Sequence, residues 1–99
     1  MTFFNVLYFD LTEDADIICV PDTIAKKIDI VRQEFLNWLP HADEDDNMYW
    51  AVVDGRKCSV CETDGFVKWL NERYCANGAK AYIVTQHVQV DDRYDTIEF

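Results

Sequence analysis

Two cysteines three residues apart form the pattern in this chain that most directly suggests chemistry. Cys58 and Cys61 make a C-x-x-C pair, which can supply two of the four ligands of a structural zinc ion or act as a redox couple. A redox pair of the thioredoxin type opens a helix, whereas this pair follows a predicted hairpin turn. We therefore expect reduced structural cysteines and no bound metal, with a zinc-stabilised adaptor as an alternative. The spacing matches no zinc finger or ribbon for the residues that could complete a site, which are Cys19, His41, Cys75 and His87.

An alternation of acidic side chains resembles the start of a calcium loop. Asp43, Asp45 and Asn47 follow the D-x-D-x-N order in which alternate side chains offer oxygen ligands. The sixth position is Met48 rather than glycine, and the twelfth is Asp54 rather than the bidentate glutamate. We therefore interpret this segment as a solvated acidic loop.

The chain offers little for nucleophilic catalysis. It contains one serine, Ser59, and two histidines, and only Cys75 with His87 can be imagined as a nucleophile and base. Its three glycines stand apart, which excludes a phosphate-binding glycine loop. We predict no catalytic residue and no cofactor, so the protein is expected not to be an enzyme.

Clustered acids are the strongest signal in the sequence. The 99 residues carry 19 Asp and Glu against 9 Lys and Arg, a net charge of −10, and the acids gather near residues 13–16, 43–46 and 91–98. Such clusters repel nucleic acids and anionic membranes and attract basic proteins. Solubility alone is the competing explanation of the charge. The residues expected to contact a basic protein are Asp43, Glu44, Asp45, Asp46, Tyr49, Trp50, Asp91, Asp92, Asp95 and Glu98.

The first half of the chain predicts a hairpin followed by a helix. Residues 2–10 and 16–20 are rich in β-formers and flank a polar turn at 11–14. In residues 22–39, apolar side chains recur every three or four positions before Pro40, which predicts one amphipathic helix. The acidic loop at 41–47 comes next.

The second half predicts the same order of elements again. Strands at 49–53 and 58–61 flank the turn residues Asp54 and Gly55, a helix begins at Thr63 or Asp64 and extends to Tyr74, and Asn77 with Gly78 ends it. Residues 79–90 predict a further strand and 94–99 an optional edge strand. The order ββαββαβ favours a single α+β domain over residues 1–99, with an antiparallel sheet of about five or six strands and two helices on one face.

Composition fits a folded intracellular protein. Hydrophobic residues make up 49% of the chain and aromatic residues 14%, which is enough for a core. The first residues lack the basic start of a secretory signal, and no apolar run reaches the roughly 18 residues of a membrane span. We expect a cytoplasmic protein whose cysteines are reduced.

Small size, acidity and aromatic residues near the acidic clusters resemble the inhibitors that phages and mobile elements direct against bacterial nucleases, such as anti-CRISPR and anti-restriction proteins. The resemblance is one of class and rests on the clusters at 13–16, 43–46 and 91–98. It implies a protein that blocks a CRISPR or restriction nuclease by nucleic-acid mimicry or steric occlusion. Immunity proteins and antitoxins that neutralise basic toxins share this profile and form the first alternative.

Overall fold

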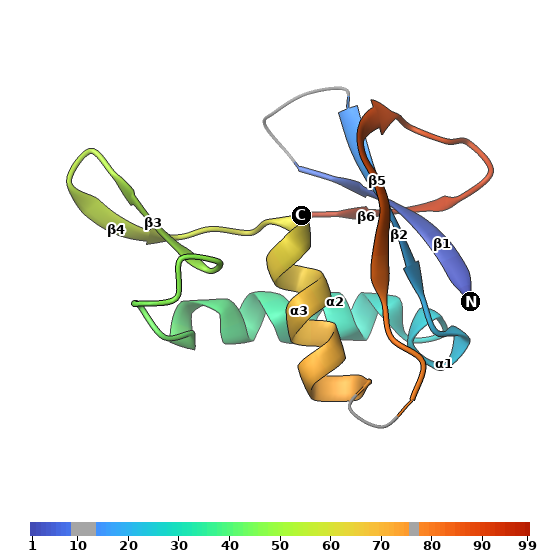
Figure 1. The fold of residues 1–99 in the computed structure, drawn as a ribbon, viewed down its shortest axis with the longest axis horizontal. Coiled ribbons are helices and arrows are strands. Elements are labelled where there is room, and N and C mark those ends of the chain that lie inside the picture. Colours follow the sequence, from blue (N-terminus) through green and yellow to red (C-terminus); the bar gives the residue numbers. More distant parts are fainter. Residues whose placement is uncertain (9–13, 76–77) are drawn as a thin grey trace.

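A four-stranded mixed sheet forms one layer of the protein (Figure 1). The computed structural model describes residues 1–8, 14–75 and 78–99. Within these residues the strand order is β5-β2-β1-β6, with β1 and β6 parallel and the other neighbours antiparallel. The strands are β1 (Thr2–Leu7), β2 (Asp14–Val20), β5 (Tyr82–Gln89) and β6 (Asp95–Glu98).

The two faces of this sheet differ because side chains alternate along each strand. Phe4 pairs with Ile18, which pairs with Ile83, and all three belong to the core or pack against it. The next row, Phe3 with Cys19 and Tyr82, lies on the opposite face. There the connection from β5 to β6 is held by Asn5, whose side chain bonds Asp91 and Tyr94 backbone atoms.

Within the described residues, three helices cover the core face of the sheet. They are α1 (Asp22–Ala25), α2 (Ile28–Trp38) and α3 (Thr63–Tyr74), and a 3-10 turn, η1 (Leu39–His41), ends α2. The single helix predicted over 22–39 is therefore wrong. The chain leaves helical geometry at Lys27, which has φ −127° and ψ 29°, and Ile24 before the break and Val31 after it are both buried.

An aromatic cluster fills the space between the helices and the sheet. The ring of Phe35 on α2 lies 5.1 Å from that of Phe66 and 5.3 Å from that of Trp69, both on α3. Phe99, the last residue, places its ring 5.0 Å from Phe66 and donates its backbone N–H to Leu7. Edge-to-face contacts of this kind add to the large apolar area that each ring buries.

The remaining strands form a separate hairpin that stands away from the sheet (Figure 1). We call β3 (Trp50–Val53), β4 (Arg56–Ser59) and the turn between them the arm. Asp54 and Gly55 have φ values of 50° and 77°, the positive values that a two-residue type I′ turn requires. The strong hairpin signal in the sequence is confirmed, although the second strand ends before Cys61.

The α+β class is confirmed, whereas the single antiparallel sheet is not. The arm forms its own two-stranded sheet, and consequently β4 is exposed throughout and β3 is only partly covered at its start. The last strand pairs in parallel with β1, since the chain crosses the sheet after β5. Parts of three predicted features lie outside the described residues. They are the turn at 11–14 except for Asp14, the end of the strand predicted at 2–10, and the helix stop at Asn77. No described helix has the length and apolar character needed to cross a bilayer.

Candidate functional site

The acidic loop, residues 43–46, follows η1 and is fixed by its own hydrogen bonds. The Asp43 carboxylate accepts the N–H of Asp45 at 3.0 Å, and the Asp43 carbonyl accepts the N–H of Asp46 at 2.9 Å. Asp46 accepts the N–H of Met48 at 3.0 Å and pairs with Lys68 of α3 at 3.2 Å. The backbone bond and the lysine hold the pKa of the Asp46 carboxyl below its usual value. Asp43, Glu44 and Asp45 remain exposed.

Tyr49 anchors this loop rather than presenting an aromatic surface. It is only 3% exposed, and its ring packs edge-on against Trp38 with the centroids 4.9 Å apart. Trp50 is partly buried and donates its indole N–H to the Ala42 carbonyl at 2.9 Å. Of the two aromatic residues predicted to touch a partner, Tyr49 therefore belongs to the core and Trp50 borders the surface.

The acidic loop lies against one face of the arm. A groove of about 150 Å³ separates them, and Lys57 reaches across it to Asp45 at 3.6 Å and to the Glu44 carbonyl at 3.3 Å. At the outer end of the arm, Val52 is 68% exposed and Val53 53% exposed. Loop and arm thus combine fixed carboxylates with exposed apolar side chains. The lining residues of the groove are Glu44, Asp45, Asn47, Trp50, Ala51, Val52 and Lys57.

The predicted acidic residues near the end of the chain lie elsewhere. Asp91 forms a bidentate contact with Arg93, with the closest atoms 2.7 Å apart, and this partner lowers the pKa of the Asp91 carboxyl to about 2. Asp92, Asp95 and Glu98 are exposed. In Figure 1 the 91–95 connection and the acidic loop lie at opposite sides of the molecule. The structure therefore does not bring the ten predicted contact residues onto one surface.

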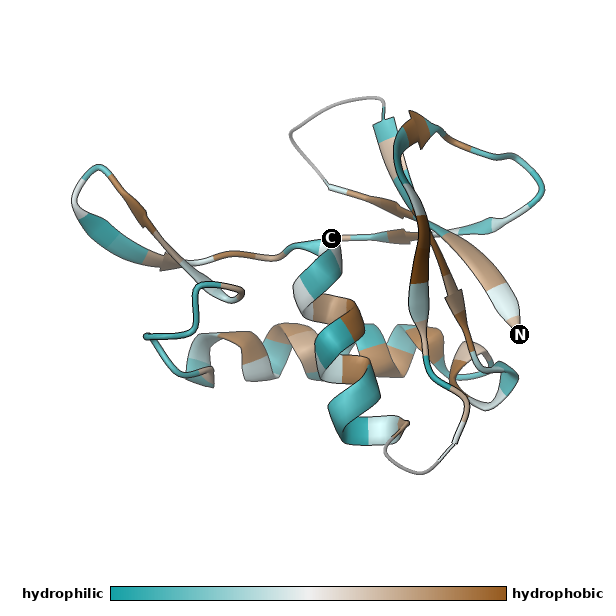
Figure 2. Cartoon of the chain, viewed as in Figure 1, coloured by the Kyte–Doolittle hydropathy of each residue, from teal (hydrophilic) through white to brown (hydrophobic). Residues whose placement is uncertain are grey.

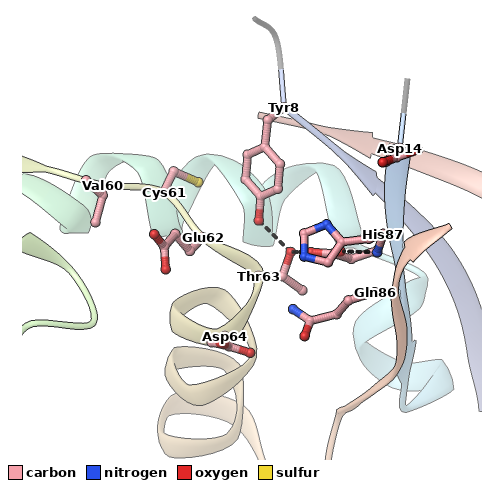
Figure 3. A pocket seen from close by; sticks show the side chains of 10 residues that line it. Tyr8, Asp14, Val60, Cys61, Glu62, Thr63, Asp64, Gln86 and His87 are labelled. Atoms are coloured by element: carbon pink, nitrogen blue, oxygen red, sulfur yellow. Dashed lines mark hydrogen bonds between the residues drawn. The ribbon is translucent and has the colours of Figure 1, made fainter. Parts of the chain in front are cut away.

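A cleft of about 770 Å³, which sequence reasoning missed, separates the sheet from the start of α3 (Figure 3). On its wall, Thr63 donates a short hydrogen bond to Asp16 and lies 2.5 Å from the Tyr8 hydroxyl. Asp16 also accepts the backbone N–H of His87 at 3.2 Å. His87 has φ 57° where the pairing of β5 with β2 is irregular. No local motif marks this network, because its members are up to 79 residues apart in the sequence.

Carboxylates give the cleft an acidic character, and the thiol that lines it is not activated. Asp14, Glu62 and Asp64 line it together with Cys61. Burial raises the pKa of the Cys61 thiol to about 12, so the reactive thiolate is disfavoured. Thr63 is 2% exposed and engaged on both sides of its hydroxyl. Tyr8, Thr63, Asp16 and His87 thus form one hydrogen-bonded network on the wall of the cleft.

The two alternative sites in the sequence gain no geometric support. Cys75 is buried at the end of α3, whereas His87 lines the cleft beside the start of that helix. A helix of 12 residues spans about 18 Å, so the pair cannot form a hydrogen bond. Cys58 is exposed on the arm, and the described residues contain no group of three or more potential ligands that could hold a metal ion.

Most exposed large apolar side chains among the described residues lie in two places, whereas Ile30 lies on α2. Besides the arm, Met1, Phe3, Tyr82 and Val84 lie on β1 and β5 or beside them, and Figure 2 shows the apolar segments of these strands. Only the arm combines such side chains with the exposed acids of the 43–46 loop. Comparisons of the chain with protein-family models, curated proteins and solved structures found no match.

Proposed function

We propose that this chain is a non-enzymatic protein-binding inhibitor that places its acidic loop and arm on a basic surface of another protein. One observation carries the proposal: Asp43, Glu44 and Asp45 are exposed on a loop whose backbone is held by hydrogen bonds, beside an arm with two exposed valines. The partner is blocked because its surface is occupied, and no reaction is needed.

Rigidity of the acidic loop supports this function. Binding orders side chains and loops, and a surface that is already ordered loses less entropy. The Asp46 carbonyl accepts the N–H groups of Tyr49 and Trp50, each at 3.1 Å, so the loop is tied to a buried residue and to the arm. The backbone that carries the exposed acidic residues is consequently ordered before a partner binds.

The acidic loop and the arm together offer the two kinds of group that protein interfaces use, charged side chains and exposed apolar side chains. Residues 43–59 contain five acidic and two basic side chains. Their negative potential speeds encounter with a basic protein and orients it, whereas apolar groups such as Val52 and Val53 supply contact area. Nucleic-acid-binding proteins are the natural partner class, because their binding surfaces carry the required positive charge.

The partner can be found by immobilising the protein and capturing proteins from a lysate of its natural host. Capture is compared for the wild type and for the triple variant Asp43→Asn, Glu44→Gln, Asp45→Asn. We expect the triple variant to bind the captured protein at least about tenfold more weakly, and wild-type binding to weaken as salt rises. The inhibitor function further requires that nucleic acid compete with the protein for the partner.

A matched control separates a local contact from a general effect of charge. The variant Asp92→Asn, Asp95→Asn, Glu98→Gln removes the same number of charges at exposed positions away from the loop. It should retain near-wild-type binding. Equal weakening by both variants, or unchanged binding by the 43–45 variant, would reject the loop as the contact. A captured basic toxin in place of a nuclease would identify the protein as an immunity protein or antitoxin.

A further inference from the structure

The free edge of β3 offers backbone groups that could bind a partner in addition to the charged side chains of the acidic loop. The arm has two strands, so each has one edge that no other described strand covers. Such an edge presents N–H and C=O groups that another extended chain can bind. Strand addition of this kind is a recurring mode of peptide recognition.

The pairing of the arm shows which groups point outward. Because the two-residue turn joins Val53 to Arg56, these residues form a hydrogen-bonded pair, and such pairs alternate along the hairpin. The N–H of Val60 bonds the Tyr49 carbonyl at 2.8 Å, as this alternation requires. The N–H and C=O of Val52 therefore point away from β4.

The acidic loop covers the free edge of β3 at the Trp50 end of the strand. The N–H of Trp50, which also points away from β4, is taken by the Asp46 carbonyl at 3.1 Å. The outward groups of β3 are therefore open at Val52, whereas the outward N–H of Trp50 is covered by the acidic loop. An extended segment that binds beside Val52 passes close to Asp45 and Glu44, which line the groove on the same face as Val52.

The other described strand edges are less suited to this role. β4 carries Arg56 and Lys57, which repel a basic segment. β5 has two irregularities in its pairing with β2, and β6 is short and contains Asp95 and Glu98. Bulges, charges and short length are the devices that protect edges from pairing. β3, with the sequence Trp-Ala-Val-Val, is as short as β6, but it has no bulge in its pairing with β4 and no charged side chain.

We propose that β3 accepts an extended segment of the basic partner as the third strand of the arm. This inference rests on the proposed function and names how the partner is held. Side chains alternate along a strand, so every second residue of the segment lies on the face of Val52, Glu44 and Asp45, where Lys57 already pairs with Asp45. These residues should be Lys or Arg, which share the carboxylates of the acidic loop with Lys57. The residues between them lie beside Ala51 and Val53 on the other face and should be apolar.

The test uses an acetylated and amidated peptide of four Lys-Val repeats, titrated into isotope-labelled protein and followed by NMR. We expect the signals of residues 50–53 to move, and the Val52 amide to exchange with solvent at least about tenfold more slowly in the complex. The same peptide with every backbone nitrogen methylated keeps the side chains but cannot donate N–H bonds. It should leave Val52 exchange unchanged.

Two matched proline variants test the edge directly. Val52→Pro removes the outward N–H of β3 without removing a bond between β3 and β4, and Ser59→Pro does the same on β4. Peptide affinity should fall about three- to tenfold for Val52→Pro and stay near the wild-type value for Ser59→Pro. Val52→Thr, which keeps the backbone donor, should retain the protection, and unchanged signals outside the arm verify that each variant is folded.

The inference is overturned if the methylated peptide protects Val52 equally, if Val52 exchange does not slow, or if both prolines act alike. Its failure is distinguishable from failure of the proposed function. When the captured partner binds Val52→Pro normally but binds the 43–45 triple variant weakly, strand addition is wrong and the acidic contact stands. When the triple variant binds the captured partner normally, the proposed function itself is wrong.

Discussion

Tyr49 lies so close to Gly65 that a side chain at that position of α3 would crowd the Tyr49 ring. A Cβ added to Gly65 would come within 3.1 Å of Cε1 of Tyr49 and 3.2 Å of the Met48 carbonyl oxygen. Through this contact, the segment that leads from the acidic loop into the arm rests directly on the helix. The position of the proposed interface is thus set by packing in the core.

We expect Gly65→Ala to lower the free energy of unfolding by about 1–2 kcal/mol. Alanine favours a helix by about 1 kcal/mol over glycine, but the contacts with a buried ring and a backbone oxygen cost more than that gain. Urea denaturation provides the measurement. Gly78→Ala is the matched control, because a Cβ there meets no atom within 4 Å, and it should not destabilise the protein. A stabilised Gly65→Ala would show that the loop yields easily.

Tyr49→Phe should leave stability unchanged or raise it by up to about 1 kcal/mol. The buried Tyr49 hydroxyl has no hydrogen-bond partner among the described residues, and burial raises its pKa to about 12. Removing an unsatisfied polar group removes its desolvation cost. Tyr8→Phe is the opposite case, because that hydroxyl bonds Thr63, and it should destabilise by about 1 kcal/mol. Thermal unfolding of the two variants checks the contrast.

Much of the fold was predictable because it depends on local patterns. The turn at Asp54 and Gly55 and the start of α3 follow from turn chemistry and apolar spacing. The break at Lys27 and the parallel pairing of β6 with β1 were not, since both result from packing between distant segments. A strand pattern also does not reveal that β3 and β4 stand apart from the sheet.

The candidate site was predictable in charge but not in geometry. Consecutive acids at 43–46 predict an exposed loop, and its first three members are exposed. The sequence could not separate Tyr49 from Trp50, because burial of the former depends on Trp38 and Gly65. Val52 and Val53 end an apolar run that predicts a strand, and this pattern does not tell whether the strand is buried. Their exposure arises because nothing packs over the outer end of the arm in the described structure.

Thr63→Val should lower the free energy of unfolding by about 2–3 kcal/mol. Valine keeps the shape of threonine but leaves the buried Asp16 carboxylate and the Tyr8 hydroxyl without their shared partner. Thr2→Val removes a hydrogen bond of the same chemical kind, from Thr2 to Asp22 at 2.8 Å, at an exposed site. Its effect should stay within about 0.5 kcal/mol. Equal effects in urea denaturation would mean that the cleft network has no special role in stability.

Alkaline pH should destabilise the protein through Cys61. Burial raises the pKa of this thiol from 9.0 to about 12, so the folded state retains the proton at pH values where the unfolded chain releases it. The stability linked to this proton is complete below pH 9 and is lost as the pH rises toward 12. The slope is at most about 1.4 kcal/mol per pH unit, and smaller because the thiol is partly solvated.

The measurement is the free energy of unfolding of the wild type and Cys61→Ser between pH 7 and 11. Serine does not titrate in this range, so the wild type should lose stability more steeply than the variant once the pH passes 9. Cys58→Ser removes the exposed thiol on the arm and keeps Cys61, so it should follow the wild type. Parallel curves for the wild type and Cys61→Ser would show that the Cys61 proton is not held by the fold, and that the cleft wall around it is open to water.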